Sequence, residues 1–201
     1  MITTIIFDLD GILIDLCDLH KKVFREALLR CAGVKIDDEY HDKELNGLPT
    51  RLKLEKIGII GRTAIDVANL KQELTLRELQ NIQPDNELYD ILTELAWSYS
   101  LFCCSNSLHE TVRLVLTKLG VIDLFEGYYG NNDVFCAKPS AEMYLKAMVQ
   151  TPAMPTETLA IEDSPIGQET IKNVGCYGLM INNRTELSLD KIIKKIEEIE
   201  Q

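Results

Sequence analysis

The sequence lacks several features that mark particular classes of protein. It contains no CxxC pair, so a structural zinc site has little support although six cysteines are present. It contains no GxxxxGK[ST] segment, which leaves a P-loop kinase or NTPase without support. No uninterrupted apolar run reaches about 18 residues, so no transmembrane helix is expected.

The N-terminal stretch from residue 2 to residue 16 is apolar, but it differs from a secretory signal. It holds no Lys or Arg, and Asp8, Asp10 and Asp15 interrupt it, whereas a signal needs a basic start and an unbroken apolar run. With 201 residues, 46% of them hydrophobic, the chain buries a core without disulfides. We therefore predict a cytoplasmic protein, and a redox or metal-storage role for the cysteines rests only on their number.

Basic residues are scarce relative to acidic ones. The chain has 21 Lys and Arg against 32 Asp and Glu, a formal net charge of -11. Such a chain repels polyanions, so nucleic acids and anionic membranes are poor partners. A small phosphorylated metabolite remains compatible, because a bound metal ion reverses the field at one site. We expect a monomer or a weak homodimer.

Short apolar runs alternate with helical patterns over most of the chain. Strands are predicted at residues 3–7, 99–104, 159–161 and 177–181, with a short edge strand near 128–129. Helices are predicted at 108–119, 140–149, 167–174 and 189–199. This alternation is typical of an α/β protein with a parallel sheet. The segment after the first strand is predicted instead to be a helical insertion, with helices at 19–31, 50–56 and 64–80.

Polar residues follow three of the predicted strands. They are Asp8 and Asp10, Ser105 and Asn106, and Glu162 and Asp163. Parallel strands place ligand sites beyond their carboxyl ends, so these side chains are expected to converge. Four carboxylates at one place repel one another unless a cation is present, which implies a hard divalent metal ion.

Four ordered motifs in these positions resemble those of the haloacid dehalogenase-like superfamily. The first is Asp8-Leu9-Asp10-Gly11 after a strand, and the second is Ser105. The third is Lys138 followed by Pro, and the fourth is the acidic pair Glu162-Asp163. One DxD motif alone is a weak signal, but four in order across residues 4–181 are a specific one.

The resemblance implies a Mg²⁺-dependent phosphatase that forms an aspartyl-phosphate. Asp8 would be the nucleophile, and Asp10 the general acid and base. Ser105 and the backbone amide of the following residue, Asn106, would hold phosphoryl oxygens of the substrate, and Lys138 would neutralise charge on Asp8 and phosphate together. Mg²⁺ would be bound by Asp8, Asp10, Glu162 and Asp163. The dehalogenases of the superfamily lack the second acid of the first motif. Its presence here as Asp10 favours phosphate chemistry over cleavage of a carbon–halogen bond.

The insertion resembles the small helical cap of the beta-phosphoglucomutase-like branch. This implies a Rossmann-like three-layer core with a parallel sheet, formed by residues 1–15 and 86–201, plus a helical cap domain at 16–85. The resemblance makes Gly47, Arg51, His20 and Lys71 candidate substrate-binding residues of the cap. The chain departs from the family pattern at Leu16 and in the Pro84-Asp85 return from the cap.

The sequence is compatible with more than one function and with more than one role for several residues. The preferred function is hydrolysis of a small phosphate monoester such as a sugar phosphate; a phosphomutase and a non-catalytic phosphate-binding protein are the alternatives. Ser105 and Asn106 also suit an ordinary helix cap. Arg51 and Lys71 also suit solvated surface charges, and His20 suits a structural role.

Overall fold

The computed structural model describes all 201 residues and divides them into two units. The core unit comprises Met1–Asp15 and Ile82–Gln201, and the helical unit comprises Leu16–Asn81. The sequence placed the second boundary later, between residues 85 and 86. Residues 82–85 lie with the core unit because the Asp85 N–H donates to the Leu119 carbonyl (3.2 Å).

The core unit is built on a five-stranded parallel sheet with the order β3-β2-β1-β4-β5. The strands are β1 (Thr4–Phe7), β2 (Ser100–Cys104), β3 (Gly127–Tyr129), β4 (Thr158–Glu162) and β5 (Tyr177–Met180). Every neighbouring pair is parallel. The predicted α/β class is therefore confirmed, and the short strand near residues 128–129 lies at a sheet edge as predicted.

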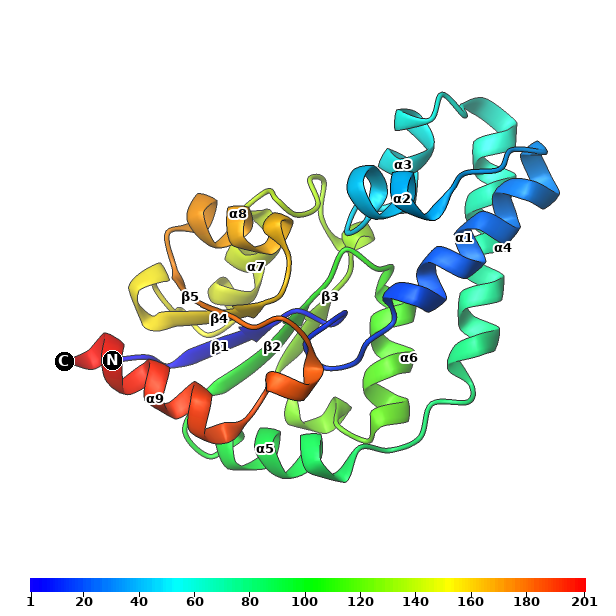
Figure 1. Ribbon diagram of the computed structural model, residues 1–201. Coiled ribbons are helices and arrows are strands. Elements are labelled where there is room, and N and C mark those ends of the chain that lie inside the picture. The colour runs from blue at the N-terminus through cyan, green and yellow to red at the C-terminus, as the bar shows by residue number, and fades with distance from the viewer. The chain divides into compact units, whose positions relative to one another are not determined.

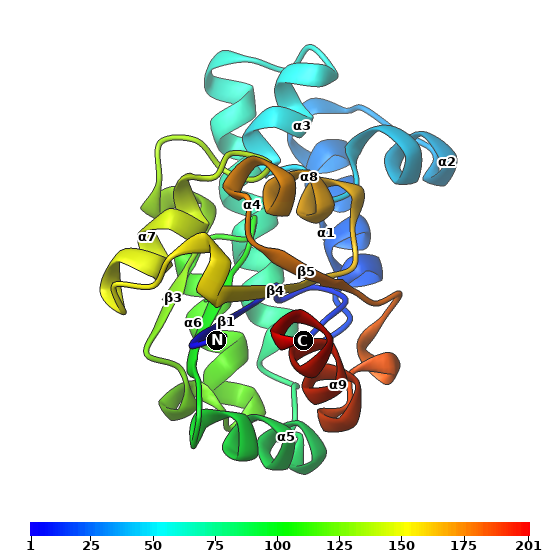
Figure 2. The ribbon, with the colours of Figure 1, turned by 90° about the vertical axis from the view of Figure 1, so that its left-hand side faces the viewer.

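Helices cover both faces of this sheet and give three layers (Figures 1 and 2). One face carries α7 (Glu142–Gln150) and α8 (Pro165–Val174); the other carries α5 (Asn86–Ala96), α6 (His109–Leu119) and α9 (Leu189–Glu200). Successive strand residues point to opposite faces, so Ile6 packs in the cluster that includes Met143 of α7. Burial on both faces explains why β1, β2 and β4 have mainly apolar sequences without a polar–apolar alternation.

Helix α5 has no counterpart among the predicted helices. The Asp85 carboxylate accepts a hydrogen bond from the Leu88 N–H (2.9 Å), which caps the helix. Its buried face has helical spacing, through Leu88, Ile91, Leu92 and Leu95. The signal for this helix is present in the sequence, but Pro84-Asp85-Asn86 suits a turn at the end of the insertion equally well.

The helical unit contains no strand, as predicted. Its helices are α1 (Cys17–Ala32), α2 (Asp38–Tyr40), a π-helix (His41–Leu45), α3 (Thr50–Lys56) and α4 (Gly61–Leu79). Phe24 and Leu28 of α1 pack with Val67 of α4 in the hydrophobic core of this unit. None of the helices in either unit is both long and apolar enough to cross a membrane.

The strand order places a topological switch point beside β1. From β1 the chain proceeds to β2 and β3 on one side and then to β4 and β5 on the other. Short 3-10 helices lie in the connections, at Ile122–Leu124, Asn131–Asp133, Pro155–Glu157 and Arg184–Glu186. Ligands of such sheets bind beyond the carboxyl ends of the strands at the switch point. The carboxyl ends of β1 and β4 are therefore the place to look for a site.

Candidate active site

Asp8 lies directly after β1, with its side chain almost completely buried. Its Oδ1 accepts hydrogen bonds from the Leu9 N–H (2.7 Å) and from Lys138 Nζ (2.9 Å). Burial raises the pKa of Asp8, the charge of Glu162 adds to the rise, and Lys138 opposes it. These contacts hold the carboxylate in one orientation and leave Oδ2 without a hydrogen bond.

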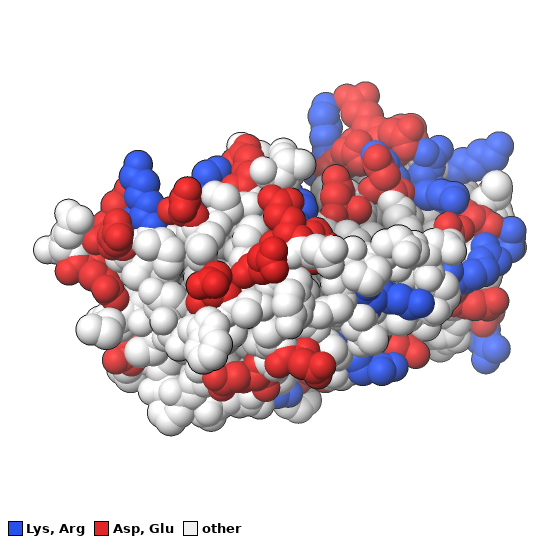
Figure 3. All heavy atoms as spheres, turned by 90° about the horizontal axis from the view of Figure 1, so that it is seen from below, with Lys and Arg blue, Asp and Glu red and all other residues white.

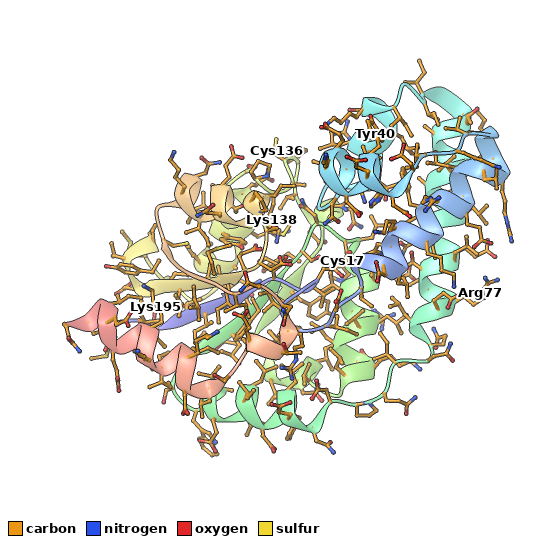
Figure 4. The ribbon with its side chains drawn as sticks, viewed as in Figure 1. Cys17, Tyr40, Arg77, Cys136, Lys138 and Lys195 are labelled. Carbon is orange, nitrogen blue, oxygen red and sulfur yellow. The ribbon has the colours of Figure 1, made fainter.

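Lys138 is the electrostatic centre of the site. It comes from the loop between β3 and α7, and its side chain is buried (Figure 4). Its Nζ donates to Asp8 Oδ1 (2.9 Å), to Glu162 Oε1 (2.8 Å) and to the Cys104 carbonyl (3.1 Å). Burial disfavours the ammonium, but the two carboxylates together raise the pKa of Lys138 above its ordinary value. All three ammonium donors are thus used within the protein.

Glu162 is fully buried at the end of β4. Its Oε1 also accepts a hydrogen bond from the hydroxyl of Tyr144, a fully buried residue of α7. The sequence alone does not single out Tyr144. The only signal available was a tyrosine on the apolar face of the helix predicted after Lys138, a position that suits ordinary core packing equally well.

Asp163 follows Glu162 and is partly exposed. Burial and the charge of Glu162 raise the pKa of Asp163 to about 6. Gly11 allows its approach: with φ of 83°, a Cβ on Gly11 would lie 2.0 Å from Asp163 Oδ2. Only glycine provides both this backbone conformation and this space. The DxDG glycine therefore makes room for a carboxylate.

The donor set fits a hard divalent cation. Asp8, Glu162 and Asp163 each offer an oxygen, and these oxygens lie within 4.8 Å of one another. Against these three carboxylates the cluster holds one cation, Lys138, so negative charge is in excess. Glu162 Oε2 is buried and accepts no hydrogen bond. Carboxylate oxygens are the ligands that Mg²⁺ prefers.

The loop after β2 brings the second motif to the same edge. Ser105 is buried, and its Oγ accepts a hydrogen bond from the Ser107 N–H (3.0 Å). Ser107 Oγ in turn donates to Asp10 Oδ2 (3.3 Å). The Asn106 amide bonds to the backbone of Lys138. The structure thus brings together all the core residues singled out from the sequence, and Ser107 is an additional residue beside Asp10.

The four candidate residues of the helical unit have surroundings of their own. Gly47 has φ of 73°, in the region that favours glycine. The Arg51 side chain is 75% exposed and pairs with Glu55 (2.7 Å), as an ordinary helix-surface arginine does. Lys71 Nζ and His20 Nδ1 lie 3.4 Å apart, so α1 and α4 bring these two together. Their predicted contacts with substrate stay predictions.

The excess of acidic residues is confined to the core unit. Residues 16–81 hold 12 of the 21 Lys and Arg and 11 of the 32 Asp and Glu, so they are nearly neutral. On the face seen in Figure 3, Lys and Arg gather over the region of α1 and α4. The field of the core unit therefore favours a cation at its carboxylate cluster.

Comparison with known proteins identifies the family. The sequence profile of the haloacid dehalogenase-like hydrolases matches residues 5–181. This chain belongs to that family. A beta-phosphoglucomutase of Bacillus subtilis (strain 168) is 24% identical over 207 residues, covering 97% of this chain and 90% of the relative. Pyrophosphatase PpaX of Oceanobacillus iheyensis is 32% identical over 166 residues, which cover 81% of this chain and 75% of the relative.

Solved structures agree with this family assignment at the level of the fold. The beta-phosphoglucomutase from Clostridium difficile matches with a TM-score of 0.85 at 20% identity, covering 98% of each chain. The family match and these relatives confirm the predicted haloacid dehalogenase-like superfamily and its beta-phosphoglucomutase-like branch. They also confirm the prediction of a phosphatase-type hydrolase of this family.

Proposed function

We propose that this hydrolase is a Mg²⁺-dependent phosphatase of small phosphate monoesters and that Asp8 is its nucleophile. The observation that carries the proposal is the buried Asp8 carboxylate, held at Oδ1 by Lys138 and the Leu9 N–H beside a carboxylate cluster. A fixed carboxylate with one oxygen free of hydrogen bonds is suited to in-line attack on phosphorus.

Asp8, Glu162 and Asp163 would hold the metal ion, together with the Asp10 carbonyl expected from the family motif. Bound there, Mg²⁺ would neutralise the phosphoryl oxygens and position the group. Its charge would also lower the pKa of Asp8 and keep the nucleophile ionised. Gly11 supports this assignment because its missing side chain is what lets Asp163 lie against the motif.

In the first step, an Asp8 carboxylate oxygen bonds to phosphorus and the bond between phosphorus and the ester oxygen breaks. Asp10 donates its proton to the leaving oxygen, so an alcohol and an aspartyl-phosphate result. In the second step, Asp10 takes a proton from water, which attacks phosphorus. The bond to Asp8 then breaks, and inorganic phosphate and the Asp8 carboxylate are released. Ser107, which donates to Asp10 Oδ2, orients this acid.

A phosphomutase is the second candidate. It is favoured by the beta-phosphoglucomutase relative, which aligns over 97% of this chain. Both reactions share the first step and differ in whether water or a sugar hydroxyl takes the phosphoryl group from Asp8. In either case Gly47, Arg51, His20 and Lys71 are our candidates for substrate recognition from the helical unit, with a cytoplasmic sugar phosphate as the substrate class.

Metal binding is tested without any substrate. At a Mg²⁺ concentration of one hundred times Kd, we expect stabilisation of about 2.7 kcal/mol, or a Tm increase of roughly 5–10 °C. The increase should vanish in Asp163→Asn and persist in Asp123→Asn, a matched change at an exposed position. Differential scanning calorimetry measures both. An equal Tm increase in Asp163→Asn would show that Mg²⁺ binds elsewhere.

The reaction is tested with a panel of phosphorylated metabolites. Wild-type protein and Asp8→Asn are compared for phosphate release with Mg²⁺, and sugar-phosphate isomers are separated in parallel by chromatography. Asp8-dependent phosphate release supports the phosphatase, and isomer interconversion with little free phosphate supports the mutase. Tight Mg²⁺-dependent binding of orthophosphate without turnover of any panel member would support a binding protein instead.

A further inference from the structure

Asn106 contacts the backbone of Lys138 at two points. Its Nδ2 donates to the Lys138 carbonyl (3.1 Å), and the Lys138 N–H donates to its Oδ1 (3.0 Å). Both ends of one side-chain amide thus bond to both polar groups of one residue. A pair of this kind fixes the position and the orientation of the backbone from which the Lys138 side chain starts.

The backbone of Asn106 is itself anchored. The Asn131 side-chain amide donates to the Asn106 carbonyl (2.5 Å), and the Asn131 N–H donates to the Ser107 carbonyl (2.9 Å). The Ser105 N–H donates to the Tyr129 carbonyl at the end of β3 (3.0 Å). The loop after β2 is therefore joined by hydrogen bonds to the first part of the loop after β3 and to its Lys138 segment, and Asn106 takes part in both connections.

The Lys138 loop has little packing of its own just before the lysine. Phe135 is 99% exposed and Cys136 is exposed, whereas Lys138 is buried (Figure 4). The N–H groups of Phe135 and Cys136 bond to the Glu142 carboxylate (2.8 Å each), which holds the outer part of the loop. Asn106 is the residue that holds the backbone of Lys138 from the side of the site.

The position of the Lys138 backbone matters because it determines whether the side-chain ammonium reaches all of its hydrogen-bond partners. Each of its three donors already has a partner: Asp8, Glu162 and the Cys104 carbonyl, at 2.8–3.1 Å. A shift of the backbone by about 1 Å would lengthen at least one of these bonds, and misplacements of this size in active sites cost up to about 10²-fold in rate.

We propose that Asn106 is a positioning residue that places the Lys138 ammonium between Asp8 and Glu162 by fixing the Lys138 backbone. The inference rests on the proposed phosphatase function, and it deepens that function by giving Asn106 a role that acts through Lys138. It concerns the side chain of Asn106 and is separate from the predicted contact of the Asn106 backbone amide with phosphoryl oxygens, since the structure engages the side-chain amide with the protein.

Positioning of Lys138 by the Asn106 side chain and direct contact of that side chain with the organic part of the substrate predict different substrate dependence. Lys138 faces the nucleophile and not a particular leaving group, so its displacement should affect every phosphate monoester alike. For Asn106→Ala we expect kcat/KM to fall about 10–100-fold, by the same factor for p-nitrophenyl phosphate, glucose 1-phosphate and fructose 1-phosphate. A factor that differs more than about tenfold among these three would overturn the inference and indicate direct contact with the organic part of the substrate.

Asn173→Ala is the matched control. Asn173 is an exposed residue of α8 whose Nδ2 donates to the carbonyl of Pro139, the next residue along the same loop (2.8 Å). We expect its kcat/KM to stay within about twofold of wild type for all three substrates. A loss equal to that of Asn106→Ala would mean that any loosening of the loop suffices, and it would overturn the specific role of Asn106.

Asn106→Asp is the second variant, in case the alanine variant does not fold. It keeps an oxygen for the Lys138 N–H but cannot donate to the Lys138 carbonyl, and the same uniform loss is expected. Wild-type turnover with no loss in either Asn106 variant overturns this inference alone. Wild-type protein that shows no Asp8-dependent turnover, with or without Mg²⁺-dependent orthophosphate binding by calorimetry, overturns the proposed function and this inference together.

Discussion

Lys138→Met is expected to lower the free energy of unfolding by about 3–5 kcal/mol, the usual loss when one partner of a buried ion pair is removed. Lys138 is 3% exposed and lies 2.9 Å from Asp8 and 2.8 Å from Glu162. Methionine keeps most of the apolar stem, but it leaves two buried carboxylates without their shared counter-ion. Chemical denaturation in metal-free buffer measures the change.

Lys146→Met is the control for this experiment. Lys146 lies on α7, where its Nζ donates to the Asp133 carbonyl (2.8 Å) and sits over the Tyr129 ring. Because it is exposed, we expect its replacement to cost less than about 1 kcal/mol. A similarly small loss for Lys138→Met would contradict the view that Lys138 balances the charge of the carboxylate cluster.

Asp8→Asn is expected to abolish turnover without unfolding the protein. The amide has nearly the same shape as the carboxylate but is not a nucleophile, and loss of a nucleophile costs about 10³–10⁶-fold in kcat. The variant also removes the repulsion between Asp8 and Glu162, while Lys138 keeps its bond to Glu162. Stability should therefore stay within about 1 kcal/mol of wild type.

Steady-state phosphate release and denaturation of the same preparation separate the two effects. Asp123→Asn, the exposed control used for metal binding, should match wild type in both assays. Asp8→Asn turnover within tenfold of wild type would rule out a nucleophilic role. Unfolding of the variant would instead assign Asp8 a mainly structural role.

The sequence was most informative where chemistry and topology coincide. Apolar runs that stop at Asp8, Ser105 and Glu162 predicted strand ends, and parallel strands bring such ends to one edge. The structure places these residues together for that reason. The strand periodicity and the parallel topology thus carried both the fold and the core of the site.

Other features depend on contacts between segments far apart in the sequence, which local patterns do not contain. The Tyr144 hydroxyl donates a hydrogen bond to Glu162, 18 residues away, and the Asn106 side chain donates one to the Lys138 carbonyl, 32 residues away. Nothing near either residue in the sequence distinguishes these contacts from core packing or substrate binding. Helix α5 is absent from the predicted helices for a different reason, because Asp85 before it suits a turn as well as a helix cap.

The most direct test of the central claim, that Asp8 carries the phosphoryl group, is acid quenching of the Asp10→Asn variant during reaction with p-nitrophenyl phosphate. This substrate has a good leaving group, so the first step does not need the Asp10 proton, whereas hydrolysis of the intermediate needs its base. We expect a burst of p-nitrophenol equal to the enzyme concentration and, by peptide mapping, phosphate on Asp8. A burst without phosphate on Asp8, or with phosphate on another residue, would contradict the mechanism.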